Sequence, residues 1–439
     1  MKLVVGGAML GVAVLTRIVH AGGMELPIWG VHSMERAGAL DASATDADAL
    51  WLNPAGLASF VGKGTQGLAF DIAYLYQPVT FTPPGGIGQA TNQQPGEPLP
   101  SLAGAVGLDD HFVVGGGVSW RYIPISRYDG VIQGYMTSGL AGSRFVQLTA
   151  GGAYLVSPKL RIGATVQDLV SALDLGVVAS ACTGAGACPA SAESNSAMPL
   201  QLDETSWFAP SGSVGVQYDV TDYLTIGGMV QAPTRVSATG TLTVTPPTAT
   251  MTVTGNQAVG SFWLPPELRA GVAYRDRVFT VEAAVDVELW SLQDKLGIDP
   301  RGVSVDQIQM SDMAIARDYK TSVDLSLGGE AHFANMQLGA GIAYETGAAP
   351  TANVSLLTVD GPKYIFGLGG GYAIDDWDIG ASVGFVYQPT IDVTDGQVGL
   401  LAPLHQPIAM PAIVNDGSYR AFDIMAGLRF AHRFKLLGS

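Results

Sequence analysis

The sequence predicts a transmembrane antiparallel β-barrel, and three observations support this fold class. Charged residues make up only 14% of the 439 residues, against roughly 25% in soluble domains. Mean hydropathy is +0.27, yet no stretch approaches the ~20 consecutive apolar residues that a membrane-spanning helix needs. Most of the chain alternates between apolar and small or polar residues, as strands do when one face meets lipid and the other a lumen.

Charge and motif content exclude several classes of function. The net charge is −16, which argues against a nucleic-acid partner because phosphates require a basic surface. The sequence contains no Cys/His cluster at zinc spacing and no P-loop motif. We therefore expect a protein that is not an enzyme and that has neither a metal site nor a cofactor.

Residues 1–21 have the pattern of a signal peptide. Lys2 precedes an apolar run at 3–15, and Val19-His20-Ala21 ends with a small residue where cleavage is expected. An N-terminal membrane anchor is the alternative, but the run is too short for one. Export of a charge-poor, alternating chain indicates the outer membrane of a Gram-negative bacterium.

Three parts follow the signal peptide. Residues 22–65 lack alternation and form a separate N-terminal segment, residues 66–434 form the barrel, and residues 435–439 form a C-terminal tail. In the first barrel segment Phe70 and Ile72 share one face, and this period of two is repeated along the chain.

Fourteen strands are expected, because six short turns alternate with seven long loops. With an even number of strands, the first strand begins and the last strand ends on the same side of the membrane. Short turns belong on the periplasmic side. The strands are expected near 66–77, 99–108, 111–125, 143–156, 159–168, 208–219, 223–233, 264–275, 278–290, 320–332, 336–346, 362–374, 376–388 and 418–434.

Two of the long loops carry further expectations. Residues 234–263 also alternate, which favours an extracellular hairpin that extends the barrel wall. An apolar stretch at the start of loop 170–207 either packs against neighbouring loops or forms part of an external apolar groove. The groove candidates are Leu169, Val170, Leu173, Leu175, Val177 and Val178. Cys182 and Cys188 of the same loop are expected to form a disulfide in an oxidising compartment.

Three motifs carry a resemblance to a known family. The first is ALDASATDADALWLNPAGLASF at 39–60, which includes Asn53, Pro54 and Ala55. The others are LPPELRAGVAYRDRVFTVEAAVDVELWS at 264–291 and SLGGEAHFANMQLGAGIAYETGAAP at 326–350. In this order, within an exported barrel, they resemble the FadL family (OMPP1/FadL/TodX) of outer-membrane transporters for long-chain fatty acids and aromatic hydrocarbons.

The resemblance implies a fourteen-stranded barrel whose lumen is plugged by an N-terminal hatch containing Asn53, Pro54 and Ala55. It also implies an extracellular apolar groove, a lumen site, and a lateral exit through a gap made by a kinked strand. The glycine run Gly115, Gly116 and Gly117 in the third strand is the candidate for that kink.

A site for a fatty-acid headgroup would need basic residues in the lumen. No Lys or Arg occurs between Arg161 and Arg235, which favours a neutral hydrophobic ligand. The remaining clamp candidates are Arg317, Lys320 and Arg269. The alternative for Arg317 and Lys320 is a solvated pair with Asp318 at the rim, which would contribute little.

The sequence thus predicts passive, hatch-gated uptake of hydrophobic molecules across the outer membrane. The expected partners are a hydrophobic small-molecule ligand, outer-membrane lipid and lipopolysaccharide, and the barrel assembly machinery. A role as a surface assembly or interaction partner is the main alternative. A polar porin is disfavoured by the low charge and by the N-terminal segment.

Overall fold

The structure is a computed structural model that describes residues 28, 30–85, 88–122, 126–128, 137–139, 142–183, 188, 196–404 and 412–435. The expected signal peptide, residues 1–21, and the tail residues 436–439 lie outside the described residues. Among the described residues, no helix is both long and apolar enough to cross a membrane.

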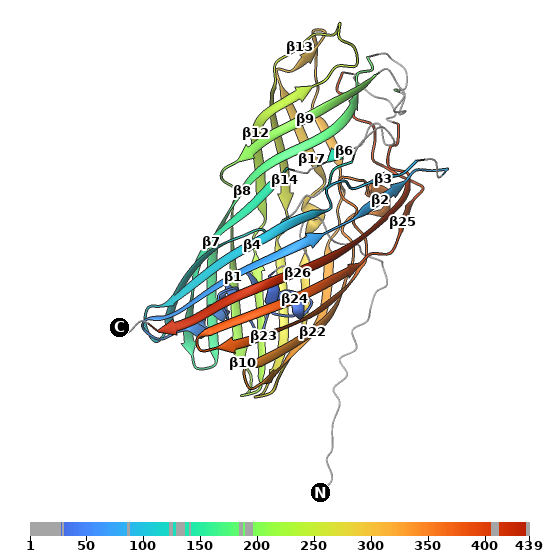
Figure 1. Ribbon diagram of the computed structural model, residues 1–439. Helices are drawn as coiled ribbons and strands as arrows, with labels where there is room; N and C mark the ends of the chain where they lie inside the picture. The colour runs from blue at the N-terminus through green and yellow to red at the C-terminus, as the bar shows by residue number, and fades with distance from the viewer. Residues whose placement is uncertain are drawn as a thin grey trace.

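Fourteen antiparallel strands form a closed barrel (Figure 1). Closure comes from β1, which pairs with β26 over its full length, from Thr65↔Lys435 to Tyr76↔Ile424. The predicted fold class and strand number are therefore confirmed. The barrel strands are β1 (Thr65–Tyr76), β4 (Gly96–Gly107), β5 (Phe112–Ser119), β7 (Arg144–Ser157), β8 (Leu160–Ser180), β10 (Pro210–Asp219), β11 (Leu224–Gln231), β15 (Glu267–Arg275), β16 (Phe279–Glu288), β21 (Ser322–Phe333), β22 (Met336–Glu345), β23 (Lys363–Ile374), β24 (Trp377–Tyr387) and β26 (Gly417–Lys435).

The alternation in the sequence becomes an inside and an outside. On β1, Phe70 and Ile72 are 40% and 41% exposed, whereas Asp71 between them is 2% exposed. Phe70 lies opposite Phe430 of β26, and Asp71 lies opposite Arg429. A belt of exposed large apolar residues thus faces outward around the barrel, while polar and small residues face the lumen, as a bilayer requires.

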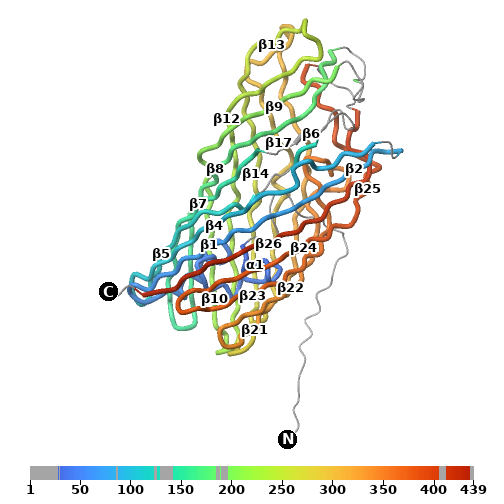
Figure 2. The backbone as a smooth tube through the Cα atoms, viewed as in Figure 1, coloured from blue at the N-terminus to red at the C-terminus, as the bar shows by residue number. Residues whose placement is uncertain are grey.

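A second tier of strands continues the wall beyond the long-loop end of the barrel (Figures 1 and 2). The upper half of β8 pairs with β9, from Ser171↔Ser206 to Ser180↔Ala197, and the extension then runs through β12, β14, β17 and β20. Its strands are β9 (Ala197–Ser206), β12 (Thr234–Val244), β14 (Gln257–Leu264), β17 (Lys295–Arg301) and β20 (Met313–Ala316).

The extension confirms one loop expectation and corrects another. The hairpin expected at 234–263 is present, because β12 pairs with β14 from Thr234↔Leu264 to Thr241↔Gln257. The expected loop at 170–207 is largely wrong, since β8 runs to Ser180 and β9 returns from Ala197. A spanning strand needs only about 9–11 residues, so the prediction ended this strand where the spanning part ends.

The remaining strands are short and lie among the long connections. They are β2 (Val79–Thr82), β3 (Ala90–Thr91), β6 (Thr137–Gly139), β13 (Val253–Thr254), β18 (Ser304–Val305), β19 (Ile308–Gln309) and β25 (Ile391–Val393). The 3-10 helices η3 (Trp290–Leu292) and η4 (Thr351–Asn353) also belong to these connections.

Three short helices lie inside the barrel near its short-turn end (Figure 2). They are α1 (Val31–Glu35), α2 (Ala49–Leu52) and the 3-10 helix η1 (Pro54–Phe60). Residues 30–64, which contain all three, are called the hatch below. One apolar core joins the hatch to the barrel wall, and a separate, larger core fills the space within the extension.

Candidate ligand-binding site

An apolar pocket lies within the extension, at the long-loop end of the barrel. It is a narrow space of about 380 Å³ when the part open to solvent is included, and little of that space is wide enough for a water molecule. Its wall is aromatic and aliphatic apart from Gln293, Arg317 and the Thr358 hydroxyl. The lining residues are Leu173, Phe262, Trp290, Gln293, Leu296, Arg317, Tyr319 and Thr358, and we call this space the rim pocket. Elements distant in sequence build it, because β8, β14, η3, β17 and two loops meet there.

Arg317 is the only cation among the residues that line the rim pocket. Its side chain is 4% exposed. The Arg317 Nη1 donates to the Tyr319 hydroxyl at 2.9 Å and also to Thr358 Oγ1. The guanidinium carbon lies 5.6 Å from the centroid of the Tyr319 ring. No described carboxylate lies within 4.0 Å of it. A buried cation with only neutral partners favours an anion in the space beside it.

The other two clamp candidates lie elsewhere. Lys320 is exposed and does not line the rim pocket. Arg269 lies in the barrel lumen, where its Nε is 3.2 Å from Glu267 Oε2 and its Nη1 is 3.8 Å from Asp286 Oδ2. Of the three, only Arg317 contacts the rim pocket.

The six groove candidates divide between the two faces of β8. Leu169, Leu173, Leu175 and Val177 are each less than 5% exposed and point into the extension. Val170 and Val178, at even positions, point to the opposite face and are half-buried. The four inward residues belong to the apolar core of the extension, and Leu173 lines the rim pocket.

A buried carboxylate lies close to the same wall. Glu204 of β9 is directly opposite Leu173 and is 3% exposed. A Cβ on Gly260 of β14 would come within 2.1 Å of Glu204 Oε2, so the glycine makes room for the carboxyl group. Burial raises the pKa of Glu204 to about 7.

A row of charged residues lines one side of the lumen below the rim pocket. Five inward residues are successive cross-strand partners on β15, β16, β21, β22 and β23. They are Arg269, Asp286, Asp324, Glu345 and Lys363, and we call them the charged row. Lys363 Nζ is 2.9 Å from Glu345 Oε1. An apolar solute beside this row would displace water from the charged side chains, and that desolvation costs free energy.

Arg121 adds a contact that spans the lumen. Its Nη2 is 2.6 Å from Glu267 Oε2 on β15, and both side chains are 1% exposed. Along β16 and the turn after it, three levels follow in order. Glu282 contacts the hatch, Asp286 belongs to the charged row, and Trp290 lines the rim pocket.

The Asn-Pro-Ala motif lies at the centre of the hatch. Asn53 is fully buried, and its Nδ2 donates to the carbonyl oxygens of Asp41 at 2.8 Å and Val216 at 3.1 Å. Its Oδ1 accepts from Ala55 N at 3.2 Å, which caps η1, and Pro54 opens that helix. Asn53 therefore joins two parts of the hatch to the wall strand β10.

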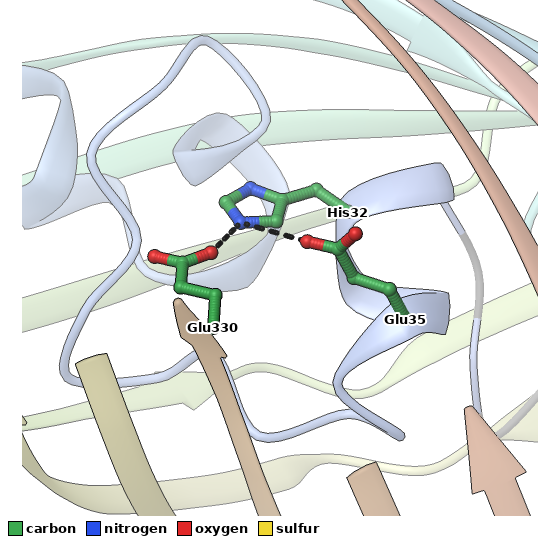
Figure 3. A group of neighbouring side chains, drawn as sticks. All are labelled: His32, Glu35 and Glu330. Carbon is green, nitrogen blue, oxygen red and sulfur yellow. Dashed lines mark hydrogen bonds and ion pairs between the residues drawn. The ribbon is translucent and has the colours of Figure 1, made fainter. Parts of the chain in front are cut away.

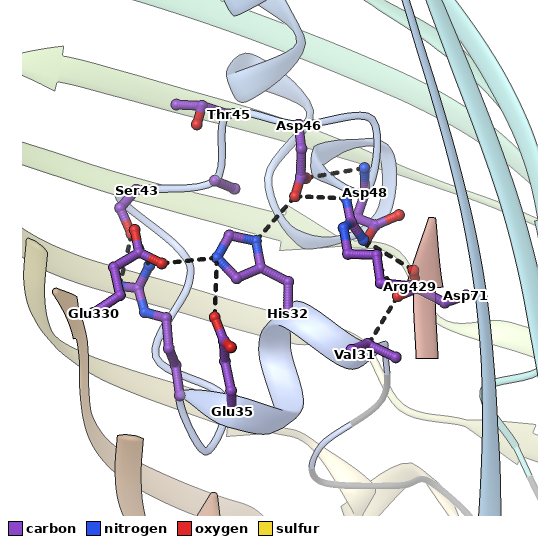
Figure 4. Close-up of polar contacts among 12 residues, drawn as sticks. Val31, His32, Glu35, Ser43, Thr45, Asp46, Asp48, Asp71, Glu330 and Arg429 are labelled. Carbon is purple, nitrogen blue, oxygen red and sulfur yellow. Dashed lines mark hydrogen bonds and ion pairs between the residues drawn. The ribbon is translucent and has the colours of Figure 1, made fainter. Parts of the chain in front are cut away.

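Charged contacts also fasten the hatch (Figure 4). Glu282 of β16 accepts from the backbone N–H groups of Asp41, Ala42 and Ser43 at 2.6–3.0 Å. Arg429 of β26 lies 2.9 Å from Asp46 and also pairs with Asp48 and with Asp71 of β1. These contacts hold the hatch in place from both sides of the lumen.

Burial raises the pKa of Asp48 to about 7, although the nearby Arg429 charge opposes that shift. Asp48 is one of the hatch carboxyl groups that pair with Arg429.

The third barrel strand ends early. Gly115, Gly116 and Gly117 lie in regular pairing with both β4 and β7, and the pairing stops at Ser119. The chain then leads to Arg121, which reaches across the lumen. In the described part of the chain, β4 before Ser101 is paired only with β1, and β7 before Gln147 only with β8.

Long side chains bridge the space that β5 leaves. Glu97 Oε1 of β4 lies 3.6 Å from Arg144 Nη1 of β7. Pro98 and Pro100 of β4 lack an N–H, which suits an edge without a neighbouring strand. These prolines were a usable sequence signal for the early end of β5.

The structure pairs Cys182 with Cys188 in a disulfide, with Cα atoms 6.0 Å apart. It lies beyond the end of β8, where both cysteines pack with Leu400 and Ala402. The disulfide thus closes a short ring after β8, and its cysteines pack against the last long connection.

Several residues of the site were missed from the sequence. Phe262 and Trp290 line the rim pocket but lie in segments read only as a hairpin and a strand end. Glu282 and Arg429 hold the hatch, and both are inward charges in strands whose neighbours are apolar. An inward charge at mid-strand needs a partner in the lumen, and that requirement was the available signal.

Comparisons with known proteins agree with this architecture. Residues 12–403 match a family model described as outer membrane protein transport protein (OMPP1/FadL/TodX). In fold, the chain is similar to a FadL homologue of Pseudomonas aeruginosa, with a TM-score of 0.77 and 16% identity over 94% of this chain and 99% of that one. No curated protein matches the sequence.

Two toluene transporters are also similar in fold. TodX of P. putida has a TM-score of 0.67 and 17% identity over 94% of this chain and 100% of that one. TbuX of Ralstonia pickettii has a TM-score of 0.66 and 17% identity over 93% of this chain and 99% of that one.

Proposed function

Because this chain belongs to the OMPP1/FadL/TodX family of outer membrane transport proteins, we propose that it carries hydrophobic molecules passively across the outer membrane of a Gram-negative bacterium. The family consists of transport proteins rather than enzymes. The observation that carries the proposal is the rim pocket, an apolar space on the long-loop side with one buried cation. Transport then follows the concentration gradient of the solute.

We assign the preferred ligand to the class of long-chain carboxylates. The hydrocarbon chain would contact Leu173, Phe262 and Leu296, and the carboxylate would accept hydrogen bonds from Arg317. A charge-assisted bond of this kind in a dry pocket is worth roughly 1.5–3 kcal/mol. Arg317 thus outweighs the argument from the basic-residue gap between Arg161 and Arg235, since it reaches the pocket from another part of the chain.

A neutral aromatic hydrocarbon is the second candidate, and a specific feature favours it. Trp290 and Tyr319 meet edge to face with centroids 5.9 Å apart, and Phe262 lines the same narrow space. Such rings bind a flat apolar ligand by area and by quadrupole contacts alone. This ligand would not need the Arg317 charge.

The exit is proposed to be lateral. A hydrophobic solute that moved straight down the lumen would pass the charged row and then meet the hatch, which ion pairs and hydrogen bonds fasten to the wall. The early end of β5 at Ser119 offers a route through the wall into the apolar part of the membrane. The hatch would act as the gate, with Asn53 coupling its two halves to β10.

The test is a binding measurement on the purified protein in detergent. One ligand is a fluorescent long-chain fatty acid, and the other is a neutral hydrocarbon of the same chain length. The variant Arg317→Gln removes the pocket cation, and Lys320→Gln removes an exposed cation three residues away as the matched control.

We expect Arg317→Gln to weaken fatty-acid binding about 10- to 100-fold and to leave hydrocarbon binding unchanged, while Lys320→Gln changes neither. Equal fatty-acid affinity in wild type and Arg317→Gln would exclude the clamp. Binding of neither ligand to the wild-type protein would favour the surface-interaction role instead.

A further inference from the structure

Three side chains with metal-ligating atoms converge where the hatch meets the wall (Figure 3). His32 and Glu35 are on α1, and Glu330 is on β21. His32 Nε2 lies 3.1 Å from Glu330 Oε2 and 3.7 Å from Glu35 Oε1. All three candidate ligand atoms lie within 4.8 Å of one another. None of these residues lines the rim pocket.

The spacing fits a small divalent ion. Tetrahedral zinc has metal–ligand bonds of about 2.0–2.2 Å, so its ligand atoms are about 3.3–3.6 Å apart. The two measured separations, 3.1 and 3.7 Å, lie on either side of that range. One imidazole with two carboxylates is a donor set for zinc and similar transition metals, whereas Ca²⁺ and Mg²⁺ prefer oxygen ligands alone.

Neighbouring groups orient the three ligands (Figure 4). Asp46 Oδ2 lies 2.9 Å from His32 Nδ1, and Arg429 holds the same carboxylate at 2.9 Å. With the Nδ1 hydrogen directed to Asp46, the Nε2 lone pair faces Glu330 and Glu35. A carboxylate behind a ligating histidine is the usual second partner in zinc sites.

That arrangement requires a positive charge between Nε2 and the carboxylates. Without one, the imidazole lone pair would face two carboxylate oxygens. Gln337 of β22 fixes the carboxylates further, because its Nε2 donates to Glu330 Oε2 at 2.8 Å and also to Glu35. A metal ion or a proton satisfies the requirement, and only the metal engages all three ligands at once.

The cluster is accessible from the short-turn end. It borders a cavity of about 990 Å³, including its open mouth, which is also lined by His332, Asp376 and Asp378. An ion can therefore reach the ligands without passing through the barrel. The fourth coordination position would face this cavity, where water can fill it.

We propose that His32, Glu35 and Glu330 bind one divalent transition-metal ion, for which Zn²⁺ is the probe, and that the ion fastens α1 of the hatch to β21. Two ligands come from the hatch and one from the wall. A bound ion would therefore link the hatch to the wall and would oppose a shift of the hatch. No local sequence pattern indicates this site, because Glu330 is 298 residues from His32.

The first test measures zinc bound to the full-length protein in detergent after treatment with a chelator. Titration calorimetry with Zn²⁺ gives the affinity, and elemental analysis after gel filtration gives the stoichiometry. We expect one zinc per chain. Co²⁺ in place of Zn²⁺ should give the visible absorption bands of a four-coordinate site. This second test needs only the wild-type protein.

The variants His32→Gln and Glu330→Gln should lose retained zinc, and Asp46→Asn should weaken binding about 10- to 100-fold. His111→Gln is the matched control, because His111 is at an exposed turn away from the cluster. Heat-modifiable migration on gels shows whether each variant still contains a folded barrel.

Wild-type protein that retains no zinc, or zinc affinity that is equal in folded Glu330→Gln and wild type, would overturn the proposal. The first of these outcomes would mean that a proton alone bridges the cluster. Neither outcome bears on ligand binding in the rim pocket, which the Arg317→Gln experiment measures separately.

Discussion

Two buried ionisable side chains, Arg317 and Glu204, lie in the extension without an oppositely charged partner among the described residues. Arg317 lines the rim pocket with only neutral partners, and Glu204 is buried opposite Leu173 without an ion pair to any described basic residue. Each group loses water on folding, and the two respond differently. The guanidinium is the proposed contact for an anionic ligand, whereas the Glu204 carboxyl group becomes neutral more readily because burial raises its pKa to about 7.

Glu204 predicts a pH dependence of stability. Its pKa in the folded protein is raised above the ordinary value of 4.5, so its contribution to folding is most favourable below pH 4.5. That contribution falls as the pH rises from about 4.5 to 7 and is then constant, and the whole change is roughly 1–3 kcal/mol. We expect Glu204→Gln to be more stable than wild type at pH 8 and similar to it at pH 5.

The measurement is the free energy of unfolding in urea at both pH values, in detergent micelles. Asp203→Asn is the control, since Asp203 is the exposed neighbour on the same strand. An equal pH dependence in wild type and Glu204→Gln would show that the carboxyl group is not buried in the folded protein.

At this scale the sequence offered Arg317 as a clamp candidate but indicated nothing of its surroundings. The structure places Arg317 in the wall of the rim pocket beside Tyr319. Phe262, Trp290 and Thr358 come from other parts of the chain. Only the pairing of β14 with β17 and the path of the loop at 346–362 bring them to Arg317, and no local pattern encodes that meeting.

At the scale of elements, wall glycines determine how closely the hatch fits. A Cβ on Gly163 of β8 would lie 2.3 Å from the Pro54 carbonyl carbon, and a Cβ on Gly215 of β10 would lie 2.1 Å from Asn53 Oδ1. The Pro54 contact is with backbone atoms, so the hatch itself has to shift if a side chain is added there.

We therefore expect Gly163→Ala to loosen the hatch within an intact barrel. Because the plug then fits poorly, water-soluble solutes should leak through, and cells should become more sensitive to a large hydrophilic antibiotic such as vancomycin. Gly380→Ala is the control, since its added Cβ would be 3.5 Å from the nearest atom. Unchanged sensitivity at normal surface levels of Gly163→Ala would contradict this account of the hatch.

The early end of β5 gives a second prediction for this scale. A cross-link between β4 and β7 should block a lateral exit at Ser119. The double variant Glu97→Cys, Arg144→Cys, treated with a short bifunctional thiol reagent, should lose most uptake of a labelled fatty acid. The single-cysteine variants, treated in the same way, should retain it. Full uptake by cross-linked protein would place the exit elsewhere.

The ends of strands were predictable from the sequence where the alternation of apolar and polar residues stopped at a turn. They were less predictable where the alternation continued beyond the barrel. On β8 the inward residues from Gly163 to Ala179 keep one period, so nothing in the pattern marks the membrane boundary near Asp168. The prediction ended this strand at residue 168, whereas β8 continues to Ser180. On β5 the opposite occurred, because the expected strand to 125 ends at Ser119, where Arg121 instead pairs with Glu267 across the lumen.

At the scale of the whole molecule, the sequence determined the barrel well. Fourteen strands followed from short turns that alternate with long loops, and the closure of β1 on β26 agrees with that number. The layers along the lumen were not predictable, since the charged row exists only through cross-strand partners on five strands. Under the proposed function, an apolar solute would enter at the rim pocket and be kept from passing straight down the lumen by the charged row and the hatch.

Uptake by cells that lack their own transporter tests the central claim most directly. Cells expressing this protein, and cells with an empty vector, receive a labelled long-chain fatty acid and a labelled neutral aromatic hydrocarbon side by side. The account predicts faster uptake of the fatty acid with the protein present, reduced by Arg317→Gln. No difference from the empty vector for either solute, with the protein verified at the cell surface, would contradict it.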